Sequence, residues 1–413
     1  KLPQYMAPAS FVVLPELPLT ANGKVDRKKL PAPGGDKKDY LAPRDELQRL
    51  LVEMWKENLG IEELGIDDDF FSLNGDSIRG AIFIYQLREK LGEPVHVATI
   101  FKAPTIERLA EHLRQEHGTA VERLLGPTAG AYELTKAQWS PLVTLQEGYK
   151  RPPLFLVHPV GGNVFCYAHL AAALGPEYTI YGLQARGLDD GQSPLPQIEE
   201  MATEYVAAVQ SVEPVGPYQL AGWSMGALIA FEMARQLDVR GAEVSFLGLI
   251  DPTDPEAGSE LRDDAGSVLL QFAMDLGLTP DHLTRPLEEL MPLDFDDQLR
   301  YLLELAKSAG VVPADTSLAY VRRLFAVFQN NVRAVTTYRA MAYDGEATLF
   351  TARERPASRR EPLAAWSSLT RAGVQVCSIP GNHYSIFRPP HVQTLAQQLK
   401  TSLSRESVKA LSV

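Results

Sequence analysis

The chain has 413 residues, which is too many for one ordinary hydrophobic core, so we expect two or three domains. Its 45% apolar and 22% charged residues are typical of a globular protein, and its formal net charge of −12 argues against nucleic acid or an anionic membrane as a partner. Two cysteines cannot form a disulfide framework, and no apolar run is long enough to span a membrane, so we expect a cytoplasmic location.

Residues 1–33 are too few to fold alone, and the chain begins at Lys1 rather than at a methionine, so we expect a piece of a longer protein. The turn signal Asn22-Gly23 favours a hairpin, which is the simplest interpretation of this stretch. Residues 17–27 also closely resemble the C-terminal end of adenylation domains of nonribosomal peptide synthetases. The resemblance implies an adenylation-domain tail over 1–33, in which Lys24 corresponds to a lysine that contacts the adenylate.

Helical periodicity begins at about residue 43 and continues to 117. Apolar residues recur every three or four positions in three stripes, which begin at Leu47, Ile78 and Ile106, and a shorter turn is expected around residues 99–102. The pattern predicts a small bundle of about four helices.

Ser77 lies at the predicted start of the second helix, after a loop that contains glycine and acidic residues. A serine in this position is often only an N-cap, and the spacing alone leaves that alternative open. The surrounding run, Phe-Phe-Ser-Leu-Asn-Gly-Asp-Ser-Ile, resembles the attachment motif of peptidyl carrier domains, with Asn74 in place of a glycine and Ile78 in place of a leucine. The resemblance covers residues 43–117 and implies that Ser77 carries 4′-phosphopantetheine, which a phosphopantetheinyl transferase would attach.

From residue 141 onward, predicted strands alternate with predicted helices, which is typical of a mostly parallel sheet with helices on both faces. The interval 252–346 is too long for an ordinary crossover, and its apolar residues are spaced as in helices, so we expect an all-helical lid over about 256–343. The strand candidates are residues 142–145, 154–158, 179–184, 218–221, 244–250, 348–351 and 374–379.

Ser224 stands at the centre of Gly-Trp-Ser-Met-Gly, between an apolar strand and a run of helix-forming residues. A side chain at Gly222 or Gly226 would collide with backbone in a bend this tight, and the bend would expose the serine hydroxyl. A helix N-cap serine is the alternative. The strand before Ser224 and the helix after it favour a nucleophile elbow.

A serine nucleophile needs a base that is itself oriented by a carboxylate, and in α/β-hydrolases the three follow in the order Ser, Asp, His. Asp251 closes the buried run Leu-Gly-Leu-Ile, and His383 follows the last predicted strand, so both are expected at the sheet edge where the elbow lies. An N-cap or turn role is the alternative for Asp251, and Asp254 is a weaker candidate because it lies past the turn. We predict a Ser224–Asp251–His383 triad.

Two backbone N–H groups are expected to stabilise the oxyanion. One belongs to Met225, the residue after the nucleophile, and the other to the loop His-Pro-Val-Gly-Gly that follows an early strand. Val160 is the predicted donor of this loop, with Gly161 as the second choice.

Together, these motifs make residues 140–405 closely resemble the type I thioesterase domains of nonribosomal peptide synthetases. The resemblance implies an α/β-hydrolase fold that accepts a peptidyl thioester from the carrier and releases it by hydrolysis or macrocyclisation. It further implies upstream condensation and adenylation domains as partners, and we predict no metal site. We therefore expect a carrier domain at 40–117, a linker at 118–139 that lets the carrier move, and the thioesterase at 140–405.

Two other functions remain open at this point. A capped esterase or lipase would explain Ser224, but it leaves the helical domain and Ser77 without a role. A carrier and docking module with an inactive hydrolase is the other alternative, and the complete Ser, Asp and His set argues against it.

Overall fold

The fold is taken from a computed structural model, which describes residues 41–73, 77–126, 139–188, 192–255, 263–283, 287–355 and 362–410. The predicted adenylation-domain tail at 1–33 lies outside these residues. Residues 127–138 of the predicted linker lie outside them as well. In the described part of the chain, no helix combines the length and the apolar character that crossing a membrane requires.

The carrier region is a helical bundle packed around Trp55, whose ring contacts Phe70 and Phe83 edge-on at centroid distances of 5.1 and 6.0 Å. Its elements are α1 (Glu46–Leu59), α2 (Ser77–Leu91), α3 (Ala98–Lys102), α4 (Ile106–Glu116) and α5 (Gly118–Leu125). The prediction of a linker is wrong for residues 118–125, because α5 buries Ala120 and Val121 in the bundle core. Apolar residues at helical spacing in α5 allow it to extend the bundle.

A seven-stranded sheet follows, in the order β1-β3-β2-β4-β5-β6-β7, and every neighbouring pair except β1 and β3 is parallel. The mostly parallel α/β sheet predicted from the sequence is therefore confirmed. Its strands are β1 (Leu142–Gln146), β2 (Lys150–Val157), β3 (Tyr178–Leu183), β4 (Tyr218–Trp223), β5 (Val244–Ile250), β6 (Ala347–Ala352) and β7 (Val374–Ile379).

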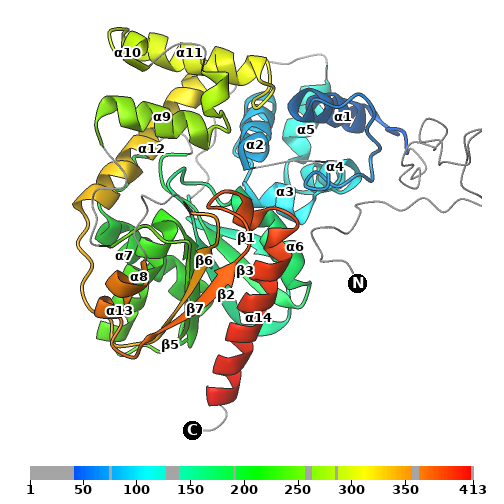
Figure 1. Ribbon diagram of the computed structural model, residues 1–413. Helices are drawn as coiled ribbons and strands as arrows, with labels where there is room; N and C mark the ends of the chain where they lie inside the picture. Colours follow the sequence, from blue (N-terminus) through cyan, green and yellow to red (C-terminus); the bar gives the residue numbers. More distant parts are fainter. Residues whose placement is uncertain are drawn as a thin grey trace, which may run out of the picture.

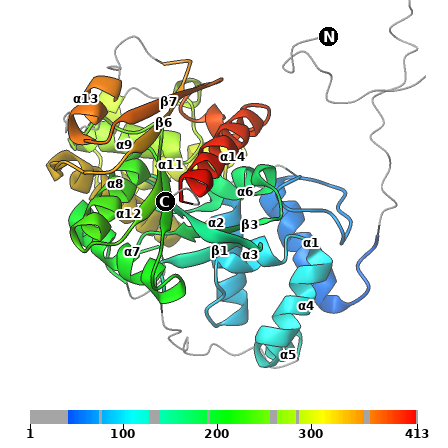
Figure 2. The same ribbon diagram turned by 90° about the horizontal axis from the view of Figure 1, so that it is seen from below.

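Helices cover both faces of the sheet, as Figures 1 and 2 show. On one face lie α7 (Ile198–Val212), α8 (Met225–Val239) and α13 (Pro362–Leu369), and on the other lie α6 (Ala168–Leu174) and α14 (His391–Ala410). Ser224, Asp251 and His383 directly follow or closely follow β4, β5 and β7, so all three lie at the carboxyl edge of the parallel strands.

The interval between β5 and β6 is helical, as predicted. It contains α9 (Ala265–Asp275), α10 (Leu287–Leu290), α11 (Phe295–Ser308) and α12 (Leu318–Thr337). The first half of α12 packs in the lid core through Val321 and Phe325, whereas Ala334 and Val335 pack in the core of the sheet. The lid therefore ends within α12 rather than near residue 343.

The carrier lies against the lid, with α2 between the lid helices and the rest of the carrier bundle (Figure 1). Ile82 of α2 is only 1% exposed, and it is part of the lid core together with Phe272 and Val321. The two domains therefore share one apolar cluster.

Candidate active site

Ser224 lies in a sharp turn between the end of β4 at Trp223 and the start of α8 at Met225. Its backbone has φ 58° and ψ −120°, a conformation that costs about 1–3 kcal/mol and is typical of functional turns. A Cβ at Gly222 would lie 2.0 Å from the Gly226 carbonyl oxygen, and one at Gly226 would lie 2.3 Å from the Val157 oxygen. Only glycine at both positions allows this turn, which has the geometry of a nucleophile elbow.

Asp251 and His383 are joined by a hydrogen bond of 2.6 Å between His383 Nδ1 and Asp251 Oδ2. An ionised carboxylate can only accept, so Nδ1 carries the proton and Nε2 keeps its lone pair. The Ser224 N–H donates to the Ile250 carbonyl at 3.0 Å, which places the elbow beside the residue before Asp251. The Trp223 ring lies 5.1 Å from the His383 ring. The fold thus gathers the three predicted triad residues at one edge of the sheet.

Arg355 also reaches the Asp251 carboxylate, and the sequence analysis did not single it out. Its Nη2 donates to Asp251 Oδ1 at 2.5 Å, and the Ala352 N–H donates to the same oxygen at 3.1 Å. Asp251 is fully buried, so these donors compensate the desolvation of its charge. The available signal was position, because Arg355 follows β6, the neighbour of β5 in the sheet.

The predicted oxyanion residues lie on both sides of the elbow. Met225 is the first residue of α8, where a backbone N–H has no acceptor within the helix. Val160 lies in the loop after β2, and its carbonyl accepts a hydrogen bond of 2.8 Å from Asn331 Nδ2 of α12. Asn331 is fully buried and was missed because the sequence does not distinguish it from the adjacent polar residues Gln329 and Asn330. Its hydrogen bond connects the loop after β2 to α12.

Tyr167 links the end of β2 to the end of β4, directly before the elbow, and sequence patterns did not indicate this role. Its hydroxyl donates to the Val157 carbonyl at 2.5 Å and accepts from the Trp223 N–H at 3.1 Å. Burial raises the pKa of the Tyr167 hydroxyl well above its usual value, so the group stays protonated as this donor. One side chain thereby sets the spacing between the ends of β2 and β4.

His158 is a structural residue of the same loop. Its Nδ1 lies 2.7 Å from the Pro159 carbonyl, which can only accept, and its Nε2 lies 2.8 Å from the Tyr205 hydroxyl. Burial lowers the pKa of His158 to about 4, so the ring is neutral near pH 7. Both ring nitrogens of His158 therefore have hydrogen-bond partners other than Ser224.

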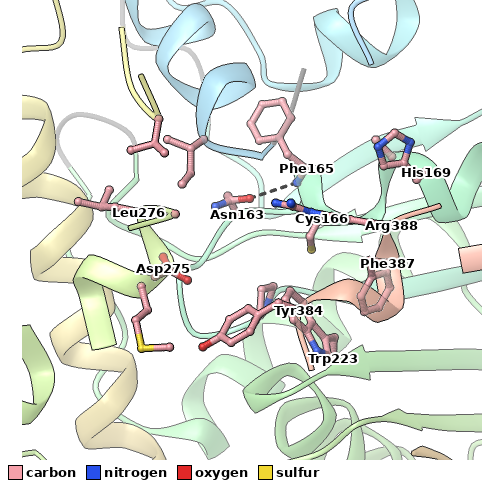
Figure 3. Close-up of a pocket in the computed structure, with 16 residues that line it drawn as sticks. Asn163, Phe165, Cys166, His169, Trp223, Asp275, Leu276, Tyr384, Phe387 and Arg388 are labelled. Atoms are coloured by element: carbon pink, nitrogen blue, oxygen red, sulfur yellow. Dashed lines mark hydrogen bonds between the residues drawn. The ribbon is translucent and has the colours of Figure 1, made fainter. Parts of the chain in front are cut away.

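A cavity of about 310 Å³ lies between the carrier and the sheet edge (Figure 3). Ile78 of α2 lines it from the carrier, and Trp223 and Tyr384, which flank the elbow and His383, line it from the hydrolase. Asp275 at the end of α9 faces the same space. Because Ile78 directly follows Ser77, the cavity connects the start of α2 with the surroundings of Ser224.

The carrier contacts the lid mainly through α2. Tyr85 stacks on Tyr320 at a centroid distance of 4.5 Å, and Arg79 Nη2 donates to the Gly310 carbonyl at 2.6 Å. A Cβ at Gly80 would lie 2.8 Å from two ring carbons of Phe165, so the absence of a side chain there permits the close approach. The surface of α2 therefore fits the lid and the α/β domain in this arrangement.

Among the residues that the structure describes, no group of three or more His, Cys, Asp and Glu side chains is arranged to hold a metal ion.

Comparison with known proteins supports this division of the chain. Residues 152–403 match the thioesterase domain family, and residues 49–113 match the phosphopantetheine attachment site family. A dimodular nonribosomal peptide synthase of Bacillus subtilis (strain 168) is 32% identical over 98% of this chain and 16% of its own length. Malpinin synthetase of Mortierella alpina is 39% identical over 69% of this chain and 4% of its own length.

A crystal structure of a holo four-domain nonribosomal peptide synthetase, bound to AMP and glycine, is also similar. It shares 33% identity and a TM-score of 0.62 over 97% of this chain and 29% of that chain. The present chain thus spans less than a third of each of these relatives. It belongs to the thioesterase domain family and joins that domain to a phosphopantetheine-attachment domain, the arrangement of the nonribosomal peptide synthetases that it resembles.

Proposed function

We propose that the carrier domain presents a peptidyl thioester, bound through 4′-phosphopantetheine on Ser77, to the thioesterase, where Ser224 accepts the acyl group and releases it. The observation that carries the proposal is the cavity between Ile78 and the Trp223–Tyr384 side of the elbow. Its mixed polar and apolar lining fits a flexible arm with amide groups, and the lining residue Ile78 directly follows the residue that would be modified. The attached group would supply the thioester sulfur.

In this proposal His383 Nε2 takes the proton of the Ser224 hydroxyl while Oγ attacks the thioester carbonyl. Asp251 holds the proton on Nδ1 and stabilises the imidazolium. The N–H groups of Met225 and Val160 receive the developing oxyanion, each contributing about 2.7–4 kcal/mol in comparable sites. The C–S bond then breaks, and His383 returns the proton to the sulfur.

The acyl group on Ser224 is released by a second nucleophile, which His383 deprotonates in the same way. Water gives a free acid, and an amine or hydroxyl of the chain gives a macrocycle. A phosphopantetheinyl transferase and the condensation and adenylation domains of a synthetase are the partners that this function requires.

Modification of Ser77 tests the carrier half of the proposal. Incubation with coenzyme A and a phosphopantetheinyl transferase should raise the intact mass by one phosphopantetheinyl group, and Ser77→Ala should show no increase. Ser72→Ala is the matched control and should be modified normally, since Ser72 is exposed in the same loop and, among the described residues, forms its hydrogen bonds with Asp69. A wild-type protein whose mass stays constant would leave only the esterase interpretation.

If the carrier docks on the thioesterase through α2, the substitution Gly80→Ala should slow transfer from the carrier. Gly80→Ala adds a Cβ 2.8 Å from the Phe165 ring, which cannot easily move because it is 3% exposed and stacks on Phe101. We expect unloading of an acyl group from the carrier to be about 5- to 150-fold slower, because a clash of this kind costs about 1–3 kcal/mol. Hydrolysis of a soluble thioester should be unchanged, as measured by steady-state kinetics.

Gly118→Ala serves as the control for this variant, since a Cβ at Gly118 meets nothing within 4 Å. It should unload at the wild-type rate. Equal rates for Gly80→Ala and wild type would show that α2 does not dock on Phe165 during transfer.

A further inference from the structure

Asp275 places a carboxyl group in the cavity between the carrier and the elbow. It is the last residue of α9, and Figure 3 shows it across the cavity from Tyr384 and Trp223. A Cβ on Gly161 would lie 2.5 Å from Asp275 Oδ2, so the carboxyl group sits directly on the oxyanion loop. The cavity thus has an acceptor close to where the thioester must react.

In the described part of the chain, the Asp275 carboxyl group has no hydrogen-bond donor as a partner. Within the described ranges, no donor lies at hydrogen-bonding distance from either oxygen, although the side chain is more than half buried. Desolvation raises its pKa to about 7, and no compensating charge or hydrogen bond accompanies the burial. Its neighbour Cys166 also has a raised pKa because of burial, so the thiol is neutral. An unpaired carboxyl group in a cavity is suited to bind a donor from a ligand.

The rest of the cavity shows which donor would fit. Asn163 Oδ1 already accepts from the Phe165 N–H at 3.2 Å, and Trp223, Phe387 and Ile78 present largely apolar surface. A ligand N–H that enters here loses its water partners and needs an acceptor. Among the lining residues, Asp275 carries a carboxyl group, which can supply this acceptor.

We propose that Asp275 is a binding residue for the carrier arm, and that its carboxyl group accepts a hydrogen bond from an amide N–H of the pantetheine thioester. The inference rests on the proposed function, since it assumes that such a thioester enters the cavity. A hydrogen bond at Asp275 would hold the arm beside the oxyanion loop, which would lower KM without changing the chemical step. Asp275 is a positioning residue in this scheme and takes no proton from Ser224.

The test compares three soluble thioesters with the same acyl group and an increasing number of amides: the S-ethyl, the S-(N-acetylcysteamine) and the S-pantetheine thioester. Asp275→Leu removes the acceptor at similar volume, and Asp275→Asn keeps a carbonyl acceptor. For Asp275→Leu, assayed at a pH above the Asp275 pKa of about 7 so that the wild-type group is ionised, we expect KM of the pantetheine thioester to rise about 10-fold or more, the loss expected for one hydrogen bond to a carboxylate, with kcat nearly unchanged. KM of the S-ethyl thioester should stay constant, and Asp275→Asn should lie closer to wild type.

Along this series, the first thioester whose KM is raised by Asp275→Leu contains the amide that Asp275 binds. An equal loss on all three thioesters would indicate a merely structural role, and no loss on any of them would also overturn the inference. A direct readout is calorimetric titration of Ser224→Ala with S-methylpantetheine, which should bind more weakly when Asp275→Leu is added. If wild type cleaves none of the thioesters, the proposed function fails, and this titration still decides whether Asp275 binds the arm.

Discussion

Ser224→Ala should leave an acyl group on the carrier that wild type releases quickly. The substitution removes the only group that the elbow presents for attack, while the fold of the turn is preserved because alanine adds no atom beyond Cβ. We expect the rate of release to fall by about 10³-fold or more, as for nucleophiles that act as a unit with their base. The measurement is the lifetime of an acyl load on Ser77, followed by intact-protein mass.

Ser77→Ala is the complementary variant. It should carry no phosphopantetheine and yet cleave soluble thioesters at nearly the wild-type rate, since Ser77 lies on the carrier and not at the elbow. Rapid unloading by Ser224→Ala is the result that the proposal could not survive. Retention of the load by wild type would instead favour an inactive hydrolase.

Asp251→Asn should lower kcat by about 10³–10⁴-fold with little change in KM. The amide NH2 of asparagine can donate to His383 Nδ1, which would force the proton onto Nε2 and remove the lone pair that is proposed to accept the serine proton. Arg355 would favour the same orientation, because it needs an oxygen acceptor at the other end of the side chain. The measurement is steady-state cleavage of a soluble thioester.

Asp254→Asn is the matched control, since Asp254 follows the same strand and is 8% exposed. It should retain most of the wild-type kcat. A large loss for Asp254→Asn together with normal activity for Asp251→Asn would contradict this assignment. It would show that Asp254, and not Asp251, orients the histidine.

Sequence patterns predicted the strands, turns and helices that are determined by residues adjacent in the sequence. The apolar run that ends at Asp251 specifies a buried strand, and Gly222 and Gly226 specify the bend at Ser224, so the strand, the turn and their order could be predicted. The start of α2 at Ser77 was likewise visible in the helical spacing.

Contacts between distant segments could not be predicted in the same way. Arg355 is one of several arginines after β6, and only the register of β5 with β6 brings it to Asp251. Asn331 and Asp275 lie in the lid, and their proximity to Val160 and Gly161 depends on how the lid folds over the sheet. The error at residues 118–125 had another origin, because glycine and polar residues hid a two-turn helix whose few apolar side chains pack on the bundle.

Ile82 belongs to the carrier, yet it fills a place among the apolar side chains of the lid. The proposed function requires the carrier to leave the thioesterase and return, and on leaving, the apolar surface that Ile82 covers in the lid would be exposed, at a cost of about 25 cal/mol per Å². Helix α12 also contacts the carrier, because Tyr320 stacks on Tyr85 of α2, and the same helix holds the Val160 carbonyl through Asn331. In the proposed function, docking of the carrier and the position of the Val160 loop would therefore depend on the same helix, α12.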